Sequence, residues 1–170
     1  MYTQTFDQMK KQLGQLDKWL STAAEHAKSR NFEPNVFAGL RLAPDQFPLT
    51  RQVQICCDTV KLAASYLSGK PADSQADTEQ TLEELQARVC SIIAYLDGFT
   101  ANDFAGAATK VVSQPRWKGE WMTGEDYLVQ HAIPNFFFHL TTTYAILRHN
   151  GVNLGKRDYL GAQTKRAPAA

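Results

Sequence analysis

The sequence predicts an all-α protein, an up-and-down four-helix bundle with a long connection between the third and fourth helices. Apolar residues recur at alternating spacings of three and four in three separate segments, as they do on one face of an amphipathic helix. Polar stretches that contain glycine and proline separate these segments. Helices that each carry one apolar stripe bury it most simply against one another, which favours a bundle.

The first helix is expected over residues 2–29, and the second from about Asp45 to about Gly69. Between them, residues 31–43 contain proline and glycine and have no sustained period, which indicates a loop. The Asp45 carboxylate could cap the free amide groups of the second helix, and glycine commonly ends a helix. The apolar stripe of the first helix consists of Phe6, Met9, Leu13, Leu16, Leu20, Ala23 and Ala27.

The third helix is expected to begin within a turn of Asp77 or Thr81 and to end near Gly98. Asp77 with Gln80 and Thr81 with Glu84 both have the spacing of a capping box, in which each side chain bonds the backbone amide of the other residue. Residues 101–122 then lose the helical period and contain turn residues between short apolar pieces. We therefore expect a long connection that holds a hairpin or a short helix.

The fourth helix is expected from Thr123 to Asn150, with Asp126 as a capping partner. Pro134 lies inside it and lacks the amide hydrogen that a helix needs, so we expect a kink or a break there. The length of 170 residues fits a single domain. We assign that domain to residues 1–161 and expect residues 162–170 to form a flexible tail.

Composition excludes several classes of function. Eighteen lysines and arginines nearly balance seventeen acidic residues, so the chain lacks the basic footprint of a nucleic-acid-binding protein. It has neither an apolar run of about 18 residues nor the apolar stretch of a secretory signal. We expect its three cysteines, Cys56, Cys57 and Cys90, to be reduced and buried. The sequence thus predicts a cytoplasmic protein without a membrane or nucleic-acid partner.

Polar residues that could serve a site gather on the second and fourth helices. His131, Asn135 and His139 are four residues apart, so neighbouring members share a face of the fourth helix. The Cα atoms of the two histidines are about 12 Å apart on a regular helix, too far to ligate one ion together. Gln54 and Asp58 are the candidates on the second helix.

Three consecutive aromatic residues, Phe136, Phe137 and Phe138, interrupt this polar pattern. They sweep about 200° of the helix, so one face of a bundle cannot bury all three. We expect one of them to reach a pocket or a subunit interface, and we favour an interface between two copies of the chain.

The C-terminal third carries a resemblance to a known family. The segments Pro134-Asn135-Phe136-Phe137-Phe138-His139, Leu147-Arg148-His149-Asn150-Gly151-Val152 and Leu154-Gly155-Lys156-Arg157-Asp158-Tyr159-Leu160-Gly161 resemble a bacterial family of the DinB-like (YfiT-like) superfamily. That superfamily consists of four-helix bundles described as metalloenzymes.

The resemblance also implies a metal site that this chain retains only in part. Metal-binding members use one histidine from the second helix and a pair at i and i+4 on the last helix. His139 matches the second histidine of that pair, whereas the first position holds Asn135. The second helix contains no histidine.

Three hypotheses for function follow. The leading one is a small-molecule binder with a degenerate metal site, which binds its ligand in the bundle pocket as a homodimer without a metal. The alternative is a divalent-metal-dependent hydrolase or thiol S-transferase. In that enzyme, His139 would hold nickel, zinc or manganese together with Asp58 or Gln54. The third is a non-catalytic interaction or scaffold protein.

Overall fold

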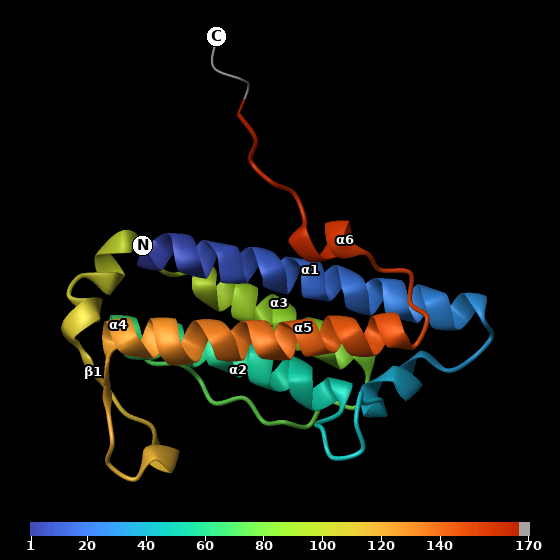
Figure 1. The fold of residues 1–170 in the computed structure, drawn as a ribbon, viewed down its shortest axis with the longest axis horizontal. Helices are drawn as coiled ribbons and strands as arrows, with labels where there is room; N and C mark the ends of the chain where they lie inside the picture. The colour runs from blue at the N-terminus through green and yellow to red at the C-terminus, as the bar shows by residue number, and fades with distance from the viewer. Residues whose placement is uncertain (167–170) are drawn as a thin grey trace.

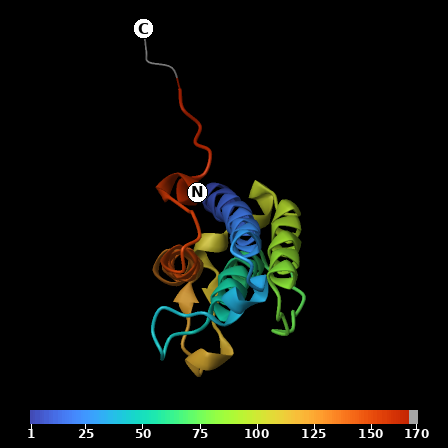
Figure 2. The same cartoon turned by 90° about the vertical axis from the view of Figure 1, so that its right-hand side faces the viewer.

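The computed structural model describes residues 1–166, and its mainly helical architecture confirms the predicted all-α class (Figure 1). Residues 167–170, the end of the expected flexible tail, lie outside the described residues. Figure 2 shows the long helices nearly end-on around a shared interior. The helices are α1 (Tyr2–Ser29), α2 (Leu49–Ser68), α3 (Leu82–Asp97), α4 (Gly124–Asp126), α5 (Ile133–His149) and α6 (Lys156–Leu160), and the π-helical turn η5 (Tyr127–Ala132) joins α4 to α5.

Most helix ends lie where local signals predict them. Of the two possible capping boxes, the one of Thr81 and Glu84 starts α3, because the Glu84 amide donates to Thr81 Oγ1 at 3.1 Å and Glu84 Oε2 accepts from the Thr81 amide at 3.0 Å. Gly69 ends α2 with φ +86°. The predicted start of α2 at Asp45 is wrong: the helix begins at Leu49, whose amide donates to Leu40 O at 2.8 Å.

The directions of the helices differ from the predicted up-and-down order, because α2 and α3 run parallel (Figure 1). Arg51, in the first turn of α2, pairs with Asp77 just before α3. Lys70, just after α2, donates to Gly98 O at 3.2 Å just after α3. The starts of the two helices therefore lie together, and so do their ends.

The link over residues 69–81 makes this arrangement possible. It contains no regular helix or strand. A chain of this length spans up to about 40 Å when extended, whereas the 20 residues of α2 rise only about 30 Å. The link can therefore return along the whole helix before α3 begins. The helices α1 and α5 run opposite to α2 and α3, with α1 packed mainly on α3 and α2 mainly on α5.

Buried ion pairs attach the link to both parallel helices. The side chain of Arg88 on α3 is only 1% exposed. It pairs with Asp58 on α2 at 2.9 Å and, in the link, with Asp77 at 3.1 Å and Glu79 at 2.9 Å. Removing one of these carboxylates would leave part of the buried charge of Arg88 uncompensated, which costs several kcal/mol.

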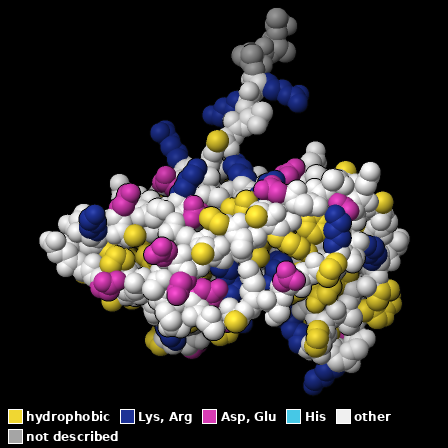
Figure 3. Space-filling model, turned by 180° about the vertical axis from the view of Figure 1, so that it is seen from behind, with side chains coloured by type: hydrophobic (Ala, Val, Ile, Leu, Met, Phe, Trp, Pro, Cys, Tyr) yellow, Lys and Arg dark blue, Asp and Glu magenta, His cyan; other side chains and the backbone are white. Residues whose placement is uncertain are grey.

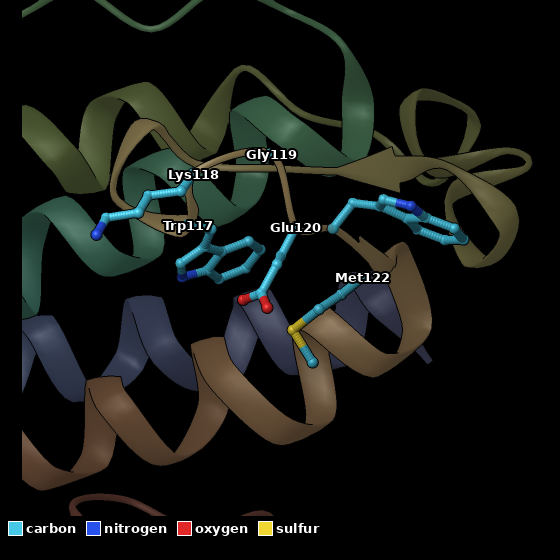
Figure 4. A pocket seen from close by; sticks show the side chains of 6 residues that line it. Trp117, Lys118, Gly119, Glu120 and Met122 are labelled. Atoms are coloured by element: carbon cyan, nitrogen blue, oxygen red, sulfur yellow. The ribbon is translucent and has the colours of Figure 1, made fainter.

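The long connection between α3 and α4 contains both predicted kinds of element. The strands β1 (Val111–Val112) and β2 (Met122–Thr123) form a small antiparallel hairpin. Trp117 and Met122 of the hairpin are partly buried against the core, whereas Lys118 and Glu120 are exposed; Figure 4 shows Lys118 directed away from the other three side chains. The short 3-10 helices are η2 (Ala101–Phe104), η3 (Ala107–Thr109) and η4 (Pro115–Trp117), and η1 (Pro34–Gly39) lies where the sequence indicates a loop.

The helix does not break or end at Pro134. The wider turn η5 precedes the proline and joins α4 to α5 as one continuous helical segment. A π-helical turn absorbs the loss of a hydrogen bond by shifting the bonding from i+4 to i+5. The capping prediction at its start is confirmed, since the Asp126 amide donates to Thr123 Oγ1 at 3.2 Å.

Figure 3 shows both signs of charge spread over the rear face, with apolar side chains gathered toward one end. Among the described helices, none is long and apolar enough to span a bilayer. Cys56 and Cys57 are buried, and burial raises the pKa of Cys57 to about 12. Cys90 is exposed, contrary to expectation, because it lies on the outward face of α3.

Gly124 supplies a test of the packing between α4 and the long connection. A Cβ atom there would collide with the carbonyl oxygen of Ala107 and lie 2.9 Å from Cδ2 of Leu67. We expect Gly124→Ala to lower the free energy of unfolding by about 2–3 kcal/mol. Gly14→Ala in α1 is the control: its Cβ meets nothing within 4 Å, so the gain in helix propensity should stabilise by about 0.5–1 kcal/mol. Urea denaturation measures both, and equal effects would contradict this packing.

Candidate functional site

A cleft of about 570 Å³ lies between α2 and the segment η5–α5. Two projecting parts of the chain flank it, residues 40–48 and the β1–β2 hairpin (Figure 1). Clefts of this volume hold small organic molecules. Its apolar walls are formed by Phe47, Ile55, Leu62, Tyr66, Pro115 and Tyr127.

Four of the five predicted polar candidates line this cleft: Asp58, His131, Asn135 and His139. Gln54 does not. It lies on the other side of α2, where its Nε2 donates to Glu79 Oε2 at 2.8 Å and its Oε1 accepts from Arg51 at 3.2 Å. Gln54 therefore helps to hold the link.

His139 has a defined tautomer, set by Gln52 of α2. The Nδ1 atom of His139 is 2.7 Å from Gln52 Oε1, while Gln52 Nε2 donates to Phe47 O at 3.0 Å. Since Gln52 Oε1 can only accept, His139 Nδ1 carries the hydrogen. The other nitrogen, Nε2, has no hydrogen-bond partner among the described residues, and the imidazole borders the cleft.

His139 is uncharged at neutral pH. Burial lowers its pKa to about 4, and the positive charge of Arg51 acts in the same direction. The imidazole is only 7% exposed. His139 therefore offers the cleft an oriented lone pair on Nε2, which can accept a hydrogen bond.

Asn135 lies one helical turn before His139 and is also held in place. Its Nδ2 donates to Thr59 Oγ1 at 2.7 Å, and the Thr59 hydroxyl in turn donates to Ile55 O at 2.6 Å. The amide nitrogen of Asn135 is thus tied to α2. The Oδ1 atom of Asn135 therefore remains as a second hydrogen-bond acceptor for a ligand in the cleft, after Nε2 of His139.

Asp58 borders the cleft, but its charge is already compensated. Its Oδ1 pairs with Arg88 Nη2 at 2.9 Å and with Lys61 Nζ at 3.0 Å. A carboxylate that bridges two cations is a poor ligand for a further ion, because binding would have to displace one of them.

At the hairpin end of the cleft, Arg116 contacts His131. Arg116 Nη2 is 2.9 Å from His131 Nε2. A guanidinium can only donate, so His131 Nε2 accepts and His131 is neutral in this pair. Burial and the charge of Arg116 both lower the pKa of His131. The rings of Trp117 and Tyr127 lie 5.5 Å and 5.4 Å from the imidazole, centre to centre.

The three consecutive phenylalanines have three different environments. Phe136 is fully buried in the core, and Phe137 is partly buried against it. Phe138 is 56% exposed, and its ring lies edge-on to His139 at 5.1 Å. The aromatic residue outside the core is therefore Phe138, and it does not line the cleft.

Gln52, Arg116 and Tyr127 also belong to the site, and the sequence does not show which contacts any of them makes there. Gln52 matters only because helix packing places it opposite His139, and Arg116 only because the hairpin folds over η5. The sequence marks neither pairing, since each joins residues that are far apart along the chain.

The donor set does not fit a resident metal ion. Among residues 1–166, no group of three His, Cys, Asp or Glu side chains is placed to hold one. In the described part of the chain, His139 is the single imidazole at its end of the cleft, and the nearby amides are weak ligands for zinc or nickel.

A second hollow, of about 700 Å³, lies on the hairpin and is shown in Figure 4. It is lined by the consecutive residues 117–122 alone. Because no polar side chain of another element converges on it, the cleft between α2 and α5 is the better candidate site.

Comparison with known proteins relates the chain to one family. Residues 1–160 match a domain of unknown function, DUF1993. The crystal structure of a DinB family member from Shewanella denitrificans is similar, with a TM-score of 0.92 and 47% sequence identity, over 96% of this chain and 93% of that one. No curated protein matches the chain. The expected DinB-like resemblance is confirmed.

The lowered pKa of His139 predicts a specific loss of stability in acid. An unfolded histidine has a pKa near 6.5, against about 4 in the fold. The neutral imidazole therefore stabilises the fold fully above about pH 6.5, and this contribution is lost as the pH falls toward 4. Urea denaturation of wild type and His139→Gln should show about 2 kcal/mol more loss in the wild type between pH 7 and pH 5. Equal losses would contradict the assigned environment.

Proposed function

The chain belongs to the DUF1993 family of DinB-like proteins, and on this premise we propose that it binds a small organic molecule in the cleft between α2 and α5 without a resident metal ion. Within this proposal, α1, α2, α3 and the continuous segment α4–η5–α5 form the four helices of a DinB-like bundle. The protein is proposed to be bacterial and cytoplasmic.

The observation that carries the proposal is the state of His139. A buried histidine with no role would be expected to use both ring nitrogens within the fold. Here Gln52 satisfies Nδ1, while Nε2 has no partner among the described residues and borders a cleft of about 570 Å³. An oriented acceptor beside apolar walls is the arrangement by which a protein binds and orients a small ligand.

The chemistry of the donors favours binding without a metal. Asp58 is occupied by Arg88 and Lys61, and Gln54 faces the link instead of the cleft. What remains near His139 is the Oδ1 atom of Asn135. One imidazole and one amide oxygen can bond a ligand with hydrogen-bond donors, but they make a weak site for zinc, nickel or manganese.

A divalent-metal-dependent enzyme is the second candidate, and one observation favours it. The bond from His139 Nδ1 to Gln52 leaves Nε2 bare, which is how outer partners orient metal-ligating histidines. In such a hydrolase or thiol S-transferase, His139 would be the main protein ligand. The ion would supply Lewis-acid activation of water or of a thiol.

A homodimer is also part of the proposal. Phe138 on α5 is 56% exposed, and Phe47 beside the cleft is 55% exposed. Large exposed aromatic side chains of this kind favour contact with another protein surface. A non-catalytic interaction or scaffold protein would use the same surface but would leave the cleft without a ligand.

Ligand binding can be tested by nuclear magnetic resonance with 3-(4-hydroxyphenyl)propionate and its neutral amide as probes. We expect amide resonances of α2 and α5 around the cleft to shift, with dissociation constants near the millimolar range for such small probes. Leu62→Trp, which fills the cleft, should weaken binding at least tenfold, whereas Val129→Trp on the exposed face of η5 should not. Shifts scattered over the surface and equal in both variants would contradict the proposal.

The metal hypothesis has its own test. Protein purified without added metal or chelator should contain no stoichiometric ion, and nickel, zinc or manganese should not raise its melting temperature. A bound ion, together with a metal-dependent rise that His139→Gln abolishes, would support the enzyme instead. Melting curves and elemental analysis decide between the two.

The oligomeric state is measured by light scattering at several concentrations. We expect a mass near twice 19.0 kDa for the wild type. Phe138→Ser should shift the mass toward that of the monomer, because it removes the exposed aromatic ring and leaves the buried Phe136 in place. A 19.0 kDa species at every concentration would contradict the dimer.

A further inference from the structure

We propose that the ligand of the cleft carries an oxyanion group, a carboxylate or a phosphate, which Arg116 binds at the hairpin end. This inference rests on the proposed function and adds the chemical class of the ligand. The shared chemistry is an anionic group that accepts hydrogen bonds, next to an apolar body.

The charges around the cleft single out Arg116. Arg51 pairs with Asp77, and Arg88 and Lys61 both pair with Asp58. Arg116 lines the cleft and makes no ion pair within the described residues 1–166; its hydrogen bond goes to the neutral His131. Among the described residues that line the cleft, Arg116 is therefore the guanidinium whose positive charge no neighbouring carboxylate offsets.

The contact with His131 makes Arg116 a prepared anion site. A guanidinium has five N–H donors in a rigid, planar fork, and His131 Nε2 occupies Nη2 alone. The donors that remain suit a carboxylate or a phosphate, which such a fork binds through two parallel hydrogen bonds. The tether to His131 also reduces the conformational entropy that the side chain loses when an anion binds.

The side chains in the rest of the cleft indicate the chemistry of the other parts of the ligand. Between the hairpin and the middle of α5, the walls are the apolar or aromatic side chains of Leu62, Tyr66 and Tyr127. At the far end, His139 Nε2 and Asn135 Oδ1 are both acceptors, so they match a hydroxyl or amine donor on the ligand.

The dimensions limit this ligand to a small molecule. Two helical turns separate His131 from His139, and each turn rises about 5.4 Å. An oxyanion at Arg116 and a donor at His139 would thus be separated by roughly 8–12 Å. A phenyl ring with a short acidic chain on one side and a hydroxyl on the other has this length.

The experiment compares matched acidic and neutral probes. The affinities of 3-(4-hydroxyphenyl)propionate, its neutral amide and 4-hydroxyphenyl phosphate are measured from the cleft resonances at about 20 mM and about 500 mM salt. We expect the wild type to bind one or both anions at least tenfold more tightly than the amide at low salt, and less selectively at high salt. The two anionic probes distinguish a carboxylate ligand from a phosphate ligand.

Substitutions at two positively charged hairpin residues, Arg116 and Lys118, test whether Arg116 causes the preference for the anion. Arg116→Gln should remove the preference for the anion, so that the variant binds the acid and the amide with affinities within about twofold of each other. Lys118→Gln removes the same charge two residues away, but Lys118 does not line the cleft, so it should keep the preference. Arg116 is exposed, and melting curves verify that both variants fold.

The possible results distinguish a failure of the oxyanion assignment from a failure of the proposed function. Equal affinity for acid and amide, or a preference that survives Arg116→Gln, overturns the oxyanion assignment and leaves the proposed function standing. A preference lost equally in both variants also overturns it, because the effect would then be one of net charge. Failure of all three probes to shift cleft resonances overturns both proposals.

Discussion

The structure depends most on how the charge of Arg88 is compensated. Its side chain is 1% exposed and needs carboxylates around it, which come from Asp58 on α2 and from Asp77 and Glu79 in the link. This set of ion pairs holds the link along the bundle, so that α2 and α3 lie parallel. It also uses the charge of Asp58, the one carboxylate among the described residues that line the cleft.

The parallel order of α2 and α3 leaves α5 to pack antiparallel on α2, and this packing forms the site. It brings Gln52 opposite His139 and Thr59 opposite Asn135, at 2.7 Å in both pairs. Each contact uses one polar atom of the α5 residue and leaves its other polar atom for the cleft. Two side chains that a sequence motif would pair as metal ligands thus become two oriented hydrogen-bond acceptors.

The β1–β2 hairpin adds Arg116, a positive group that makes no ion pair within the described residues, at its end of the cleft. The π-helical turn η5 supports this end, because it presents His131 and Tyr127 toward the hairpin residues Arg116 and Trp117. Functional sites often lie beside π-helical turns, where a helix departs from its regular spacing.

The sequence by itself determined the all-α class, the limits of α1 and α3, the glycine end of α2 and the DinB-like resemblance, because caps, breakers and apolar periods act within a few residues. It also indicated four of the polar residues that line the cleft. Only the tertiary structure decided the parallel order of α2 and α3, the tautomer of His139 and the contact of Arg116 with His131. Each of these depends on groups far apart in the chain, whose pairing is set by burial and charge compensation in the packed protein and leaves no local pattern in the sequence.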